Sequence, residues 1–410
     1  MTLGLFDGFG IELEYMVVDA ATFAVRPVVD ELLRHFAGRY VGDFDDGPVS
    51  WSNELALHVV ELKTNGPSPT LAGLGGAFAT SARRLDAALA PMGARLCGGG
   101  MHPLMDPARE FRRWPHDYGD VYGAYDRIFD CRGHGWSNLQ SCHLNLPFAN
   151  DDEFGRLHLA CRALLPLLPA LAASSPYAEG RHHGWLDWRL SVYRHNQERV
   201  PRIAGQVVPE PVTTRADYFT QVLEPIWSDI APFDPEHLLR EEWLNSRGVV
   251  AKFSRDSLEI RVLDVQEHPA ADLAISTLIV AVLRQLAAAR WCSLAALAAL
   301  PTGELASLLW RVARLGERAT IDHAGLLLAL GLPSAPLLAG EVWRRLAERL
   351  LPDVRGFDAA LERPLQTILT RGPRARRLLD HYGETPSRDD LLHACHRLAD
   401  CLAGGESFVG

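Results

Sequence analysis

The segment Gly-Ile-Glu-Leu-Glu-Tyr-Met-Val-Val-Asp, residues 10–19, alternates apolar and acidic side chains near the start of the chain. In an extended strand, alternate side chains share a face. Glu12 and Glu14 are therefore expected to project together, while Ile11 and Leu13 pack behind them. The segment predicts a strand with a buried back and two carboxylates on its open face.

A distant segment, Leu-Glu-Ile-Arg-Val-Leu-Asp at 258–264, has a similar pattern. Here Glu259 and Arg261 share one face, and the alternating apolar residues line the other. Acidic residues on the open face of a sheet suit hard cations such as Mg²⁺, which take oxygen ligands. A neighbouring arginine suits the phosphates that such cations accompany. The two segments together predict a nucleotide-using active site.

Two further segments carry polar residues of the same kind. Ser141, His143 and Asn145 alternate with apolar neighbours, which predicts another strand with one polar face. Glu54 and Glu61 are seven residues apart, so a regular strand would place them on opposite faces. Both can reach one site only through a bulge or bend. Each pattern alone also fits a solvated strand face, and the combination is what predicts a site.

The composition excludes several classes of protein. Hydrophobic residues make up 48% and charged residues 22% of the 410 residues, as in an ordinary globular enzyme. The net charge of −10 argues against nucleic acid as the main partner. The apolar stretches 157–173 and 273–289 contain charged or proline residues, so we expect buried helices rather than membrane spans.

The cysteines and the first residues indicate the compartment. The chain has 7 cysteines with no Cys-x-x-Cys pair, which favours reduced thiols that act as small core residues. Its beginning lacks the basic start and long apolar core of a secretory signal. We therefore expect a cytoplasmic protein.

The order of predicted elements favours the α+β class. Strands before residue 268 are separated by long helical or irregular insertions without a strand–helix rhythm, which favours an antiparallel sheet. From about residue 269 the chain becomes Ala- and Leu-rich with helical periodicity. We predict a sheet-containing catalytic region at 1–268 and a helical region at 269–410 that packs on the same domain.

Taken in order, these segments resemble the carboxylate–amine ligases of the glutamate–cysteine ligase type 2 family, in the glutamine synthetase-like superfamily. The motifs that carry the resemblance are Gly10-Ile-Glu-Leu-Glu, Glu54 to Glu61, Gly100-Met-His102-Pro103, His143-Leu-Asn145, Glu179-Gly-Arg181 with Arg189, and Leu258 to Gln266. The chain departs from the family at Asn145, where a second histidine is common, and at Val59, where glutamine is common.

The resemblance implies a fold and a reaction. It implies an antiparallel sheet that forms an active-site funnel, with helices on its outer face. It implies ATP-dependent formation of an amide, in particular a γ-glutamyl amide, through an acyl phosphate. The expected cofactors are ATP and Mg²⁺, with Mn²⁺ as an alternative. The expected partners are a small carboxylate such as glutamate and an amine acceptor. The assembly state is left open, with a homo-oligomer among the options.

The resemblance and the reaction also imply roles for individual residues. The expected metal ligands are Glu12, Glu14, Glu54, Glu61, Glu259 and His143. The expected nucleotide or phosphate contacts are Arg261, Arg247, His143 and Asn145. The expected contacts to the carboxylate substrate are Arg189, Arg181 and His102. The expected catalytic residues are Glu61, Arg261 and Arg247. Asp264 and Gln266 are expected to orient the strand arginine from behind.

Other functions fit parts of the pattern. A phosphotransferase of the guanidino-kinase type would use the same superfamily site without forming an amide. A nucleotide-binding regulatory protein that has lost activity would keep the fold. A metal-dependent hydrolase would use the glutamates and histidines but leaves the arginine-bearing strand unexplained. Analysis of the products formed from ATP separates these functions from a ligase.

Overall fold

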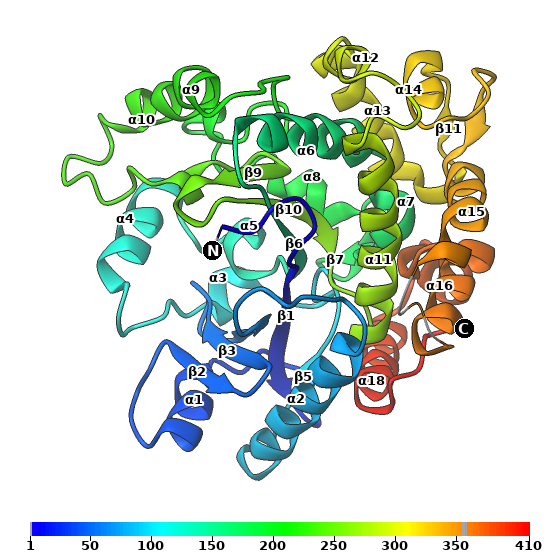
Figure 1. The fold of residues 1–410 in the computed structure, drawn as a ribbon. Coiled ribbons are helices and arrows are strands. Elements are labelled where there is room, and N and C mark those ends of the chain that lie inside the picture. Colours follow the sequence, from blue (N-terminus) through cyan, green and yellow to red (C-terminus); the bar gives the residue numbers. More distant parts are fainter. Residues whose placement is uncertain (1, 355–356, 358) are drawn as a thin grey trace.

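An antiparallel sheet lies at the centre of the computed structural model, which describes residues 2–354, 357 and 359–410 (Figure 1). Its strand order is β2-β3-β4-β1-β6-β10-β9, and β5 pairs with the second half of β1. The strands are β1 (Gly10–Asp19), β2 (Asp43–Asp46), β3 (Val49–Asn53), β4 (Val59–Thr64), β5 (Ala94–Cys97), β6 (Ser141–Pro147), β9 (Val249–Lys252) and β10 (Ser257–Asp264).

The long strand β1 organises this sheet, because it pairs with β4, β6 and β5. Ile11, Leu13 and Tyr15 on its back are fully buried at 0% exposure. The helices α2 (Leu74–Leu89), α6 (Asp151–Leu164) and α11 (Pro269–Ala287) pack together behind the sheet. The opposite face of the sheet carries the polar side chains and borders the cavities described below.

The remaining helices surround this core. Before α11 they are α1 (Val29–Ala37), α3 (Pro107–Glu110), α4 (Gly119–Phe129), α5 (His134–Ser137), α7 (Pro169–Ala172), α8 (Trp188–Tyr193), α9 (Arg215–Tyr218) and α10 (Glu224–Ile230). After it come α12 (Leu294–Ala298), α13 (Thr302–Leu315), α14 (Ala324–Ala329), α15 (Ala339–Leu350), α16 (Ala359–Arg371), α17 (Arg374–Tyr382) and α18 (Arg388–Gly404). Short two-stranded ladders join β7 (Tyr177–Ala178) to β8 (Arg181–His182) and β11 (Thr320–Ile321) to β12 (Leu337–Leu338).

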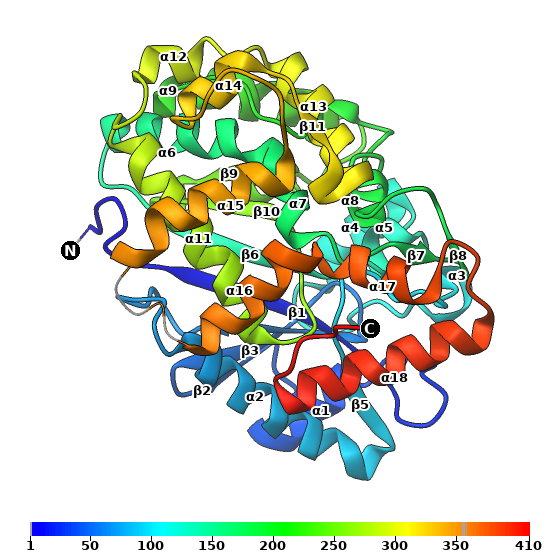
Figure 2. The same cartoon turned by 90° about the vertical axis from the view of Figure 1, so that its right-hand side faces the viewer.

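The helices of the C-terminal part pack back onto the sheet-containing part. Figure 2 shows α11 and α16 crossing in front of the sheet, with α18 below them. Helix α16 packs on α11, and α18 packs on β5 and α2. By length and composition α11 could cross a membrane, yet 83% of its most apolar window is buried in the protein. Its apolar surface therefore serves as the contact between the two parts.

The predicted α+β class and antiparallel sheet are confirmed. The predicted bend between Glu54 and Glu61 is confirmed, and residues 54–63 do not form one regular strand. Strand β3 ends at Asn53, the chain reverses, and β4 begins at Val59. The reversal is the bend that the spacing of Glu54 and Glu61 requires, because it lets both carboxylates face the same side of the sheet.

Strand β10 contains an irregularity next to the polar face. Its register with β6 shifts between Ile260 and Leu263, so two residues of β10 lie opposite one residue of β6. This arrangement is a β-bulge. Because of it, Arg261 and Asp264 can both contribute to the same side of the sheet, although they are three residues apart.

Candidate active site

The polar face of the sheet lines a cavity of about 630 Å³. All of the glutamates predicted from the sequence line it, and the structure brings together Glu12, Glu14, Glu54, Glu61 and Glu259. A second cavity of about 800 Å³ adjoins it over the beginning of β1 and contains Asn145. Glu12, Asp43, Lys63 and Arg255 line both cavities. Glu12 therefore lies where the linings of the two cavities meet, while Glu14, Glu54, Glu61 and Glu259 line the first cavity.

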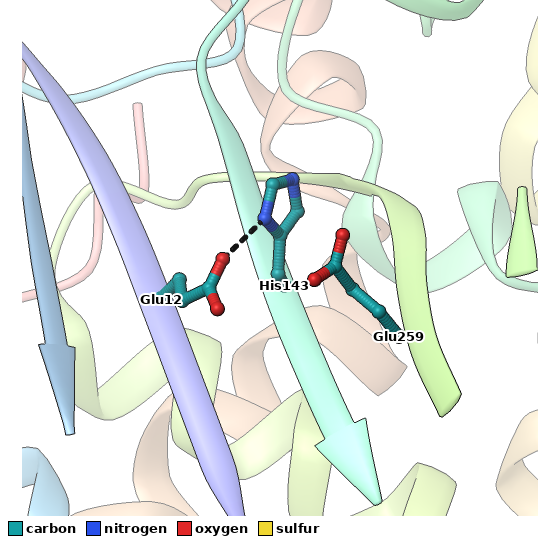
Figure 3. Close-up of side chains that lie close together, drawn as sticks. All are labelled: Glu12, His143 and Glu259. Carbon is teal, nitrogen blue, oxygen red and sulfur yellow. Dashed lines mark hydrogen bonds and ion pairs between the residues drawn. The ribbon is translucent and has the colours of Figure 1, made fainter. Parts of the chain in front are cut away.

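The strand register brings Glu12 beside His143, because Glu12 of β1 pairs with His143 of β6. Glu12 Oε2 lies 2.7 Å from His143 Nδ1, and Glu12 Oε1 accepts a hydrogen bond of 3.0 Å from Asn145 Nδ2. In Figure 3, Glu12, His143 and Glu259 converge from three strands. One ligand atom from each of these three residues lies within 4.8 Å of the others.

A second group of potential metal ligands lies farther along the sheet, beginning with Glu14, two residues after Glu12 on β1. The register pairs Glu14 with Glu61 of β4. Glu14 accepts hydrogen bonds from the backbone N–H and the hydroxyl of Ser141, at 2.7 and 3.0 Å. Ser52 donates a hydrogen bond of 2.7 Å to Glu61. Glu14, Glu61 and His143 also bring one ligand atom each within 4.8 Å of one another.

Two cations lie beside the first group. Glu259 is fully buried at 0% exposure and forms ion pairs with both Lys252 and Arg261. Burial and the neighbouring Arg261 guanidinium lower the pKa of Lys252 to about 8. Such partly buried positive charges are suited to hold phosphate oxygens, because desolvation strengthens their interactions.

The pKa values of the carboxylates reflect the crowding of negative charge. Burial raises the pKa of Glu61 to about 7, and the Glu12 carboxylate adds to that rise. Burial and the carboxylates of Glu14, Glu61 and Glu12 raise the pKa of Glu54 well above its usual value. Burial also acts on Glu12, but the hydrogen bond and charge of His143 hold its pKa well below the usual range.

This donor set fits a divalent cation. Carboxylate oxygens are the ligands that Mg²⁺ and Mn²⁺ prefer, and an imidazole nitrogen is acceptable to Mn²⁺. A bound cation would also offset the repulsion that contributes to the raised pKa values of Glu54 and Glu61. The residues that would hold it are Glu12, Glu14, Glu54, Glu61, Glu259 and His143.

The raised pKa of Glu61 leads to a prediction for the metal-free protein. The folded-state pKa of about 7 exceeds the ordinary value of 4.5, so the folded state binds the extra proton. The resulting stabilisation is present below pH 4.5 and is lost as pH rises towards 7, by about 3 kcal/mol in total. Glu61→Gln has no carboxyl group that titrates at this position. We therefore expect the free energy of unfolding of the variant to rise relative to that of the parent protein as pH rises.

Thermal denaturation with a chelator present, at intervals from pH 5 to pH 8, measures this difference. Glu153→Gln is a matched control, because Glu153 lies outside the cavity at the start of α6. Parallel curves for the parent protein and Glu61→Gln would contradict the assignment of a raised pKa to Glu61.

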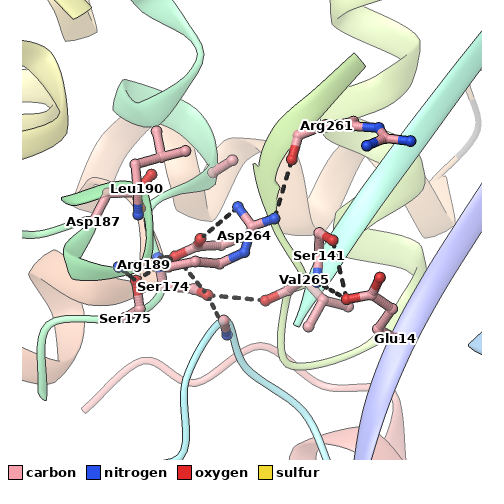
Figure 4. A network of polar contacts seen from close by, with 12 residues as sticks. Glu14, Ser141, Ser174, Ser175, Asp187, Arg189, Leu190, Arg261, Asp264 and Val265 are labelled. Atoms are coloured by element: carbon pink, nitrogen blue, oxygen red, sulfur yellow. Dashed lines mark hydrogen bonds and ion pairs between the residues drawn. The ribbon is translucent and has the colours of Figure 1, made fainter. Parts of the chain in front are cut away.

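A buried network of hydrogen bonds and an ion pair lies next to the cavity (Figure 4). Asp264 accepts hydrogen bonds from the backbone N–H of Ser174 at 2.8 Å and from the hydroxyl of Ser175 at 2.7 Å. Its other oxygen lies 3.5 Å from Arg189 Nη1, and Arg189 Nη2 donates a 3.0 Å hydrogen bond to the backbone carbonyl of Arg261. The network thus links Asp264 to the strand segment that carries Arg261.

Comparisons with known proteins identify the family of the chain. The sequence pattern named "Glutamate-cysteine ligase family 2 (GCS2)" matches residues 8–396 of the chain. The chain belongs to this family. As a member it is an ATP-dependent ligase of the glutamate–cysteine ligase type.

Relatives of this ligase occur in archaea and bacteria. A protein of Archaeoglobus fulgidus without a functional name is 38% identical over 276 residues, which cover 67% of this chain and 73% of the relative. A Nocardioides protein named "Putative glutamate--cysteine ligase 2-1" is 26% identical over 289 residues, covering 69% of this chain and 68% of the relative.

Solved structures share the fold of the ligase at low sequence identity. A glutamate–cysteine ligase from Francisella tularensis, solved in complex with AMP, has a TM-score of 0.58 at 11% identity, covering 96% of this chain and 88% of that one. A bifunctional glutathione synthetase from Pasteurella multocida has a TM-score of 0.54 at 16% identity, covering 98% of this chain and 52% of that one.

The ligase does not bring every predicted site residue into the cavity. Arg247 is buried but directed to Glu210, which accepts hydrogen bonds of 2.6 and 2.7 Å from its guanidinium. Its neighbour Ser246 lines the cavity instead. Arg181 lies on the two-residue strand β8 with its side chain 68% exposed, 3.3 Å from Glu179. The geometry therefore gives these two arginines no contact with the cavity.

His102 is also separate from the cavity. It is 5% exposed, its backbone N–H donates a 2.7 Å hydrogen bond to Asn138, and its Nδ1 accepts one from the N–H of Leu104. These local bonds are those of a structural turn. Burial lowers its pKa to about 4. Arg189 does line the cavity, but its guanidinium is engaged by Asp264.

The sequence reasoning missed several residues that line the cavity of the ligase. Lys63 lies two positions after Glu61 on the same strand face, so strict alternation could have identified it. Lys252 could have been found in the same way once β9 was placed next to β10. The rings of Tyr122, Tyr125 and Trp243 come from helical and irregular segments, and no periodicity in the sequence points to them.

Proposed function

We propose that this ligase joins the γ-carboxyl group of glutamate to an amine through an acyl phosphate, with Mg²⁺ or Mn²⁺ bound by the cavity carboxylates. The observation that carries the proposal is the pair of adjoining carboxylate–histidine groups, both of which include His143, beside Lys252 and Arg261. Transfer of a phosphoryl group to a carboxylate brings several negative charges together, and this arrangement supplies the opposite charge.

The reaction has two steps. A carboxylate oxygen of the donor attacks the γ-phosphorus of ATP, the bond to the bridging oxygen breaks, and ADP leaves. The amine nitrogen then attacks the carbonyl carbon of the acyl phosphate, the bond to the phosphate oxygen breaks, and inorganic phosphate leaves. The amine loses one proton as the amide forms.

The side chains of the chain have distinct parts in this scheme. Glu12, Glu14, Glu54, Glu61, Glu259 and His143 would hold divalent cations, whose charge would offset that of the phosphate oxygens. The carboxylates of Glu12, Glu14 and Glu259 supply the negative charge of the part of the cavity that would hold the cations. Arg261 and Lys252 supply fixed positive charge to the phosphoryl oxygens. Fixed, partly buried charges of this kind need little reorganisation during transfer, and positioning together with electrostatic stabilisation supplies most of the catalysis of phosphoryl transfer.

Oxygen-18 transfer tests the acyl phosphate. Purified protein is incubated with ATP, Mg²⁺, an amine panel and glutamate labelled with oxygen-18 in its γ-carboxyl group. We expect one labelled oxygen to appear in the released inorganic phosphate, together with a γ-glutamyl amide in the mass spectrum. Label in AMP with release of pyrophosphate would mean adenylation instead. A phosphorylated amine without an amide would identify a phosphotransferase.

A further inference from the structure

A second hollow of about 640 Å³ lies on the other side of helix α8 from the catalytic cavity. Arg189 and Tyr193, one helical turn apart on α8, line the catalytic cavity. Trp188 and Ser191 of the same helix line the second hollow. The helix therefore separates the two spaces. We call the second hollow the outer groove, and the residues that define it in the following argument are Phe129, Trp136, Trp185, Trp188, Arg194 and Asn196.

The catalytic cavity and the outer groove meet at the C-terminal end of α8. Gly135, Trp136 and Asn196 line both spaces. Asn196 Nδ2 donates a 2.5 Å hydrogen bond to the backbone carbonyl of Gly135. A Cβ atom at position 135 would come within 1.5 Å of Asn196 Oδ1, so the lack of a side chain at Gly135 lets Asn196 lie at this boundary. A ligand that extends from the cavity into the groove passes these three residues.

A row of aromatic rings continues from the catalytic cavity into the outer groove. Tyr125 lines the cavity, Trp136 lines both spaces, and Phe129 lines the groove. The ring centroid of Trp136 lies 4.8 Å from that of Tyr125 and 5.9 Å from that of Phe129. Trp185 and Trp188, whose centroids are 6.4 Å apart, add two further rings to the groove. Continuous apolar surface of this kind suits the body of an extended ligand.

The outer groove also contains a guanidinium group without an acidic partner. Arg194 Cζ lies 5.6 Å from the ring centroid of Trp185 and 4.7 Å from that of Trp310. Within residues 2–354, 357 and 359–410, its side chain forms no ion pair and no hydrogen bond, and its Nε is buried. The charge of Glu198 acts on it, but that carboxylate lies 3.5 Å from His195 Nε2. A guanidinium beside aromatic rings is suited to receive a ligand carboxylate through two N–H groups.

The acidic residues that line the outer groove do not neutralise Arg194. The Glu179 carboxylate lies 3.3 Å from Arg181 Nη2 and 3.6 Å from His134 Nε2. Asp130 is exposed at the C-terminal end of α4. In the described part of the chain, neither of these carboxylates forms an ion pair with Arg194. The groove therefore offers this guanidinium to an anionic group of a ligand.

The cations inside the catalytic cavity have other partners. Arg261 and Lys252 are both paired with Glu259. The charge of Arg261 also acts on Tyr125, and its Nη1 lies 3.5 Å from the backbone carbonyl of Asn245. In an α-amino acid the amine and the carboxylate share one carbon atom, so such an acceptor would have to share Arg261 with Glu259 and the phosphoryl group. A peptide places its carboxylate many bonds from its amine.

We propose that the acceptor of this ligase is a short peptide, whose α-amine enters the catalytic cavity and whose C-terminal carboxylate is held by Arg194 in the outer groove. This inference rests on the proposed ligase function and names its acceptor. The peptide passes Gly135 and Asn196, and its body lies against the rings of Trp136 and Phe129. A helix with its side chains is about 10 Å across, so about three residues of extended peptide span the end of α8.

The reaction with a peptide is the one described for an amine. The α-amine nitrogen forms a bond to the carbonyl carbon of the acyl phosphate, and the bond from that carbon to the phosphate oxygen breaks. The released inorganic phosphate carries away the proton that the nitrogen loses.

Matched acceptors test this proposal. The tripeptide Ala-Ala-Phe and its C-terminal amide have the same amine and the same body, and they differ only in the terminal carboxylate. Alanine and cysteine carry the carboxylate next to the amine. Phosphate release and amide formation are measured with ATP, Mg²⁺ and glutamate. We expect kcat/KM for Ala-Ala-Phe to exceed that for the other three acceptors by about tenfold or more, since a guanidinium–carboxylate pair is a strong polar contact. An equal or higher value for the amide or for cysteine would overturn the proposal.

Hydroxylamine separates this inference from the proposed function. It is a small acceptor that converts activated carboxylates to hydroxamates without reaching the outer groove. Hydroxamate formation without an amide from Ala-Ala-Phe would overturn the peptide assignment and leave the ligase function standing. Failure to form hydroxamate from glutamate or from any other carboxylate donor would instead count against the ligase function.

Two variants locate the carboxylate of the peptide in the structure. Arg194→Gln removes the positive charge, and we expect the ratio of kcat/KM for Ala-Ala-Phe to that for its amide to fall by about tenfold. Arg132→Gln removes an exposed arginine between α4 and α5 that lines neither space, and we expect it to leave the ratio unchanged. The ratio is independent of any change in overall activity. Equal ratios in the two variants would contradict the placement of the carboxylate at Arg194.

A third variant tests the path of the peptide. Asn196→Phe places a larger side chain at the boundary between the catalytic cavity and the outer groove. We expect it to raise the KM for Ala-Ala-Phe several-fold more than the KM for hydroxylamine, because only the peptide has to pass this boundary. An equal change in both KM values would contradict the proposed path.

Discussion

Glu12→Gln is expected to reduce turnover by about 1000-fold, which corresponds to about 4 kcal/mol of transition-state stabilisation. Glu12 forms one group of potential metal ligands with His143 and Glu259, and its low pKa keeps it ionised. Glutamine has nearly the same shape, so the hydrogen bond to Asn145 can be retained. The change removes the negative charge that a divalent cation needs. It also turns an amide nitrogen towards His143 Nδ1, which lies 2.7 Å from Glu12 Oε2 in the parent protein.

Initial rates of phosphate release at saturating ATP, glutamate and acceptor measure this loss. Asp19→Asn is a suitable control, because Asp19 ends the same strand and is paired with Arg26 outside the cavity. Circular dichroism and thermal denaturation establish that both variants are folded. Activity of Glu12→Gln within about threefold of the parent protein would remove Glu12 from the metal site.

Asp264→Ala is expected to destabilise the protein by about 3–5 kcal/mol. The substitution leaves Arg189, which is 2% exposed, buried without its carboxylate partner. It also removes the acceptor that holds the backbone of Ser174 and the hydroxyl of Ser175. We expect lower activity as well, because Arg189 positions the backbone of Arg261.

Urea denaturation measures this effect, and two variants make the test specific. Asp322→Ala removes the partner of Arg311 in an exposed ion pair, so we expect a cost below about 1 kcal/mol. Arg189→Met in the background of Asp264→Ala should recover part of the lost stability, because it removes the unpaired buried charge. An additive loss in the double variant would show that Asp264 acts independently of Arg189.

The strands and the glutamates could be predicted because the alternation of apolar and polar residues indicates that a segment is a strand. It also indicates which side chains share a face of that strand. The runs at residues 10–19 and 258–264 read directly as β1 and β10, and the structure aligns Glu12, Glu14 and Glu259 in one cavity. Each of these predictions depends on local periodicity of 2 residues, which the pleat of a strand enforces.

The arginines were harder to predict because a guanidinium reaches far and its direction depends on its partner. Arg247 points to Glu210, and no spacing in the sequence indicates this partner. Arg181 points to Glu179, which lies two residues before it in the turn that joins β7 to β8. The aromatic rings that line the cavity were missed for a related reason. Tyr122 and Tyr125 come from helix α4, Trp136 from α5 and Trp243 from the segment before β9, so only the tertiary fold brings them together.

The β-bulge in β10 has a consequence for protein engineering. If β10 kept all of its residues but paired evenly with β6, Asp264 would turn towards the apolar layer formed by α6 and α11. Arg189 would lose its counter-charge at the same time. The extra residue is thus part of the site, and transplanting this strand into another scaffold requires the irregular spacing to be copied along with the side chains.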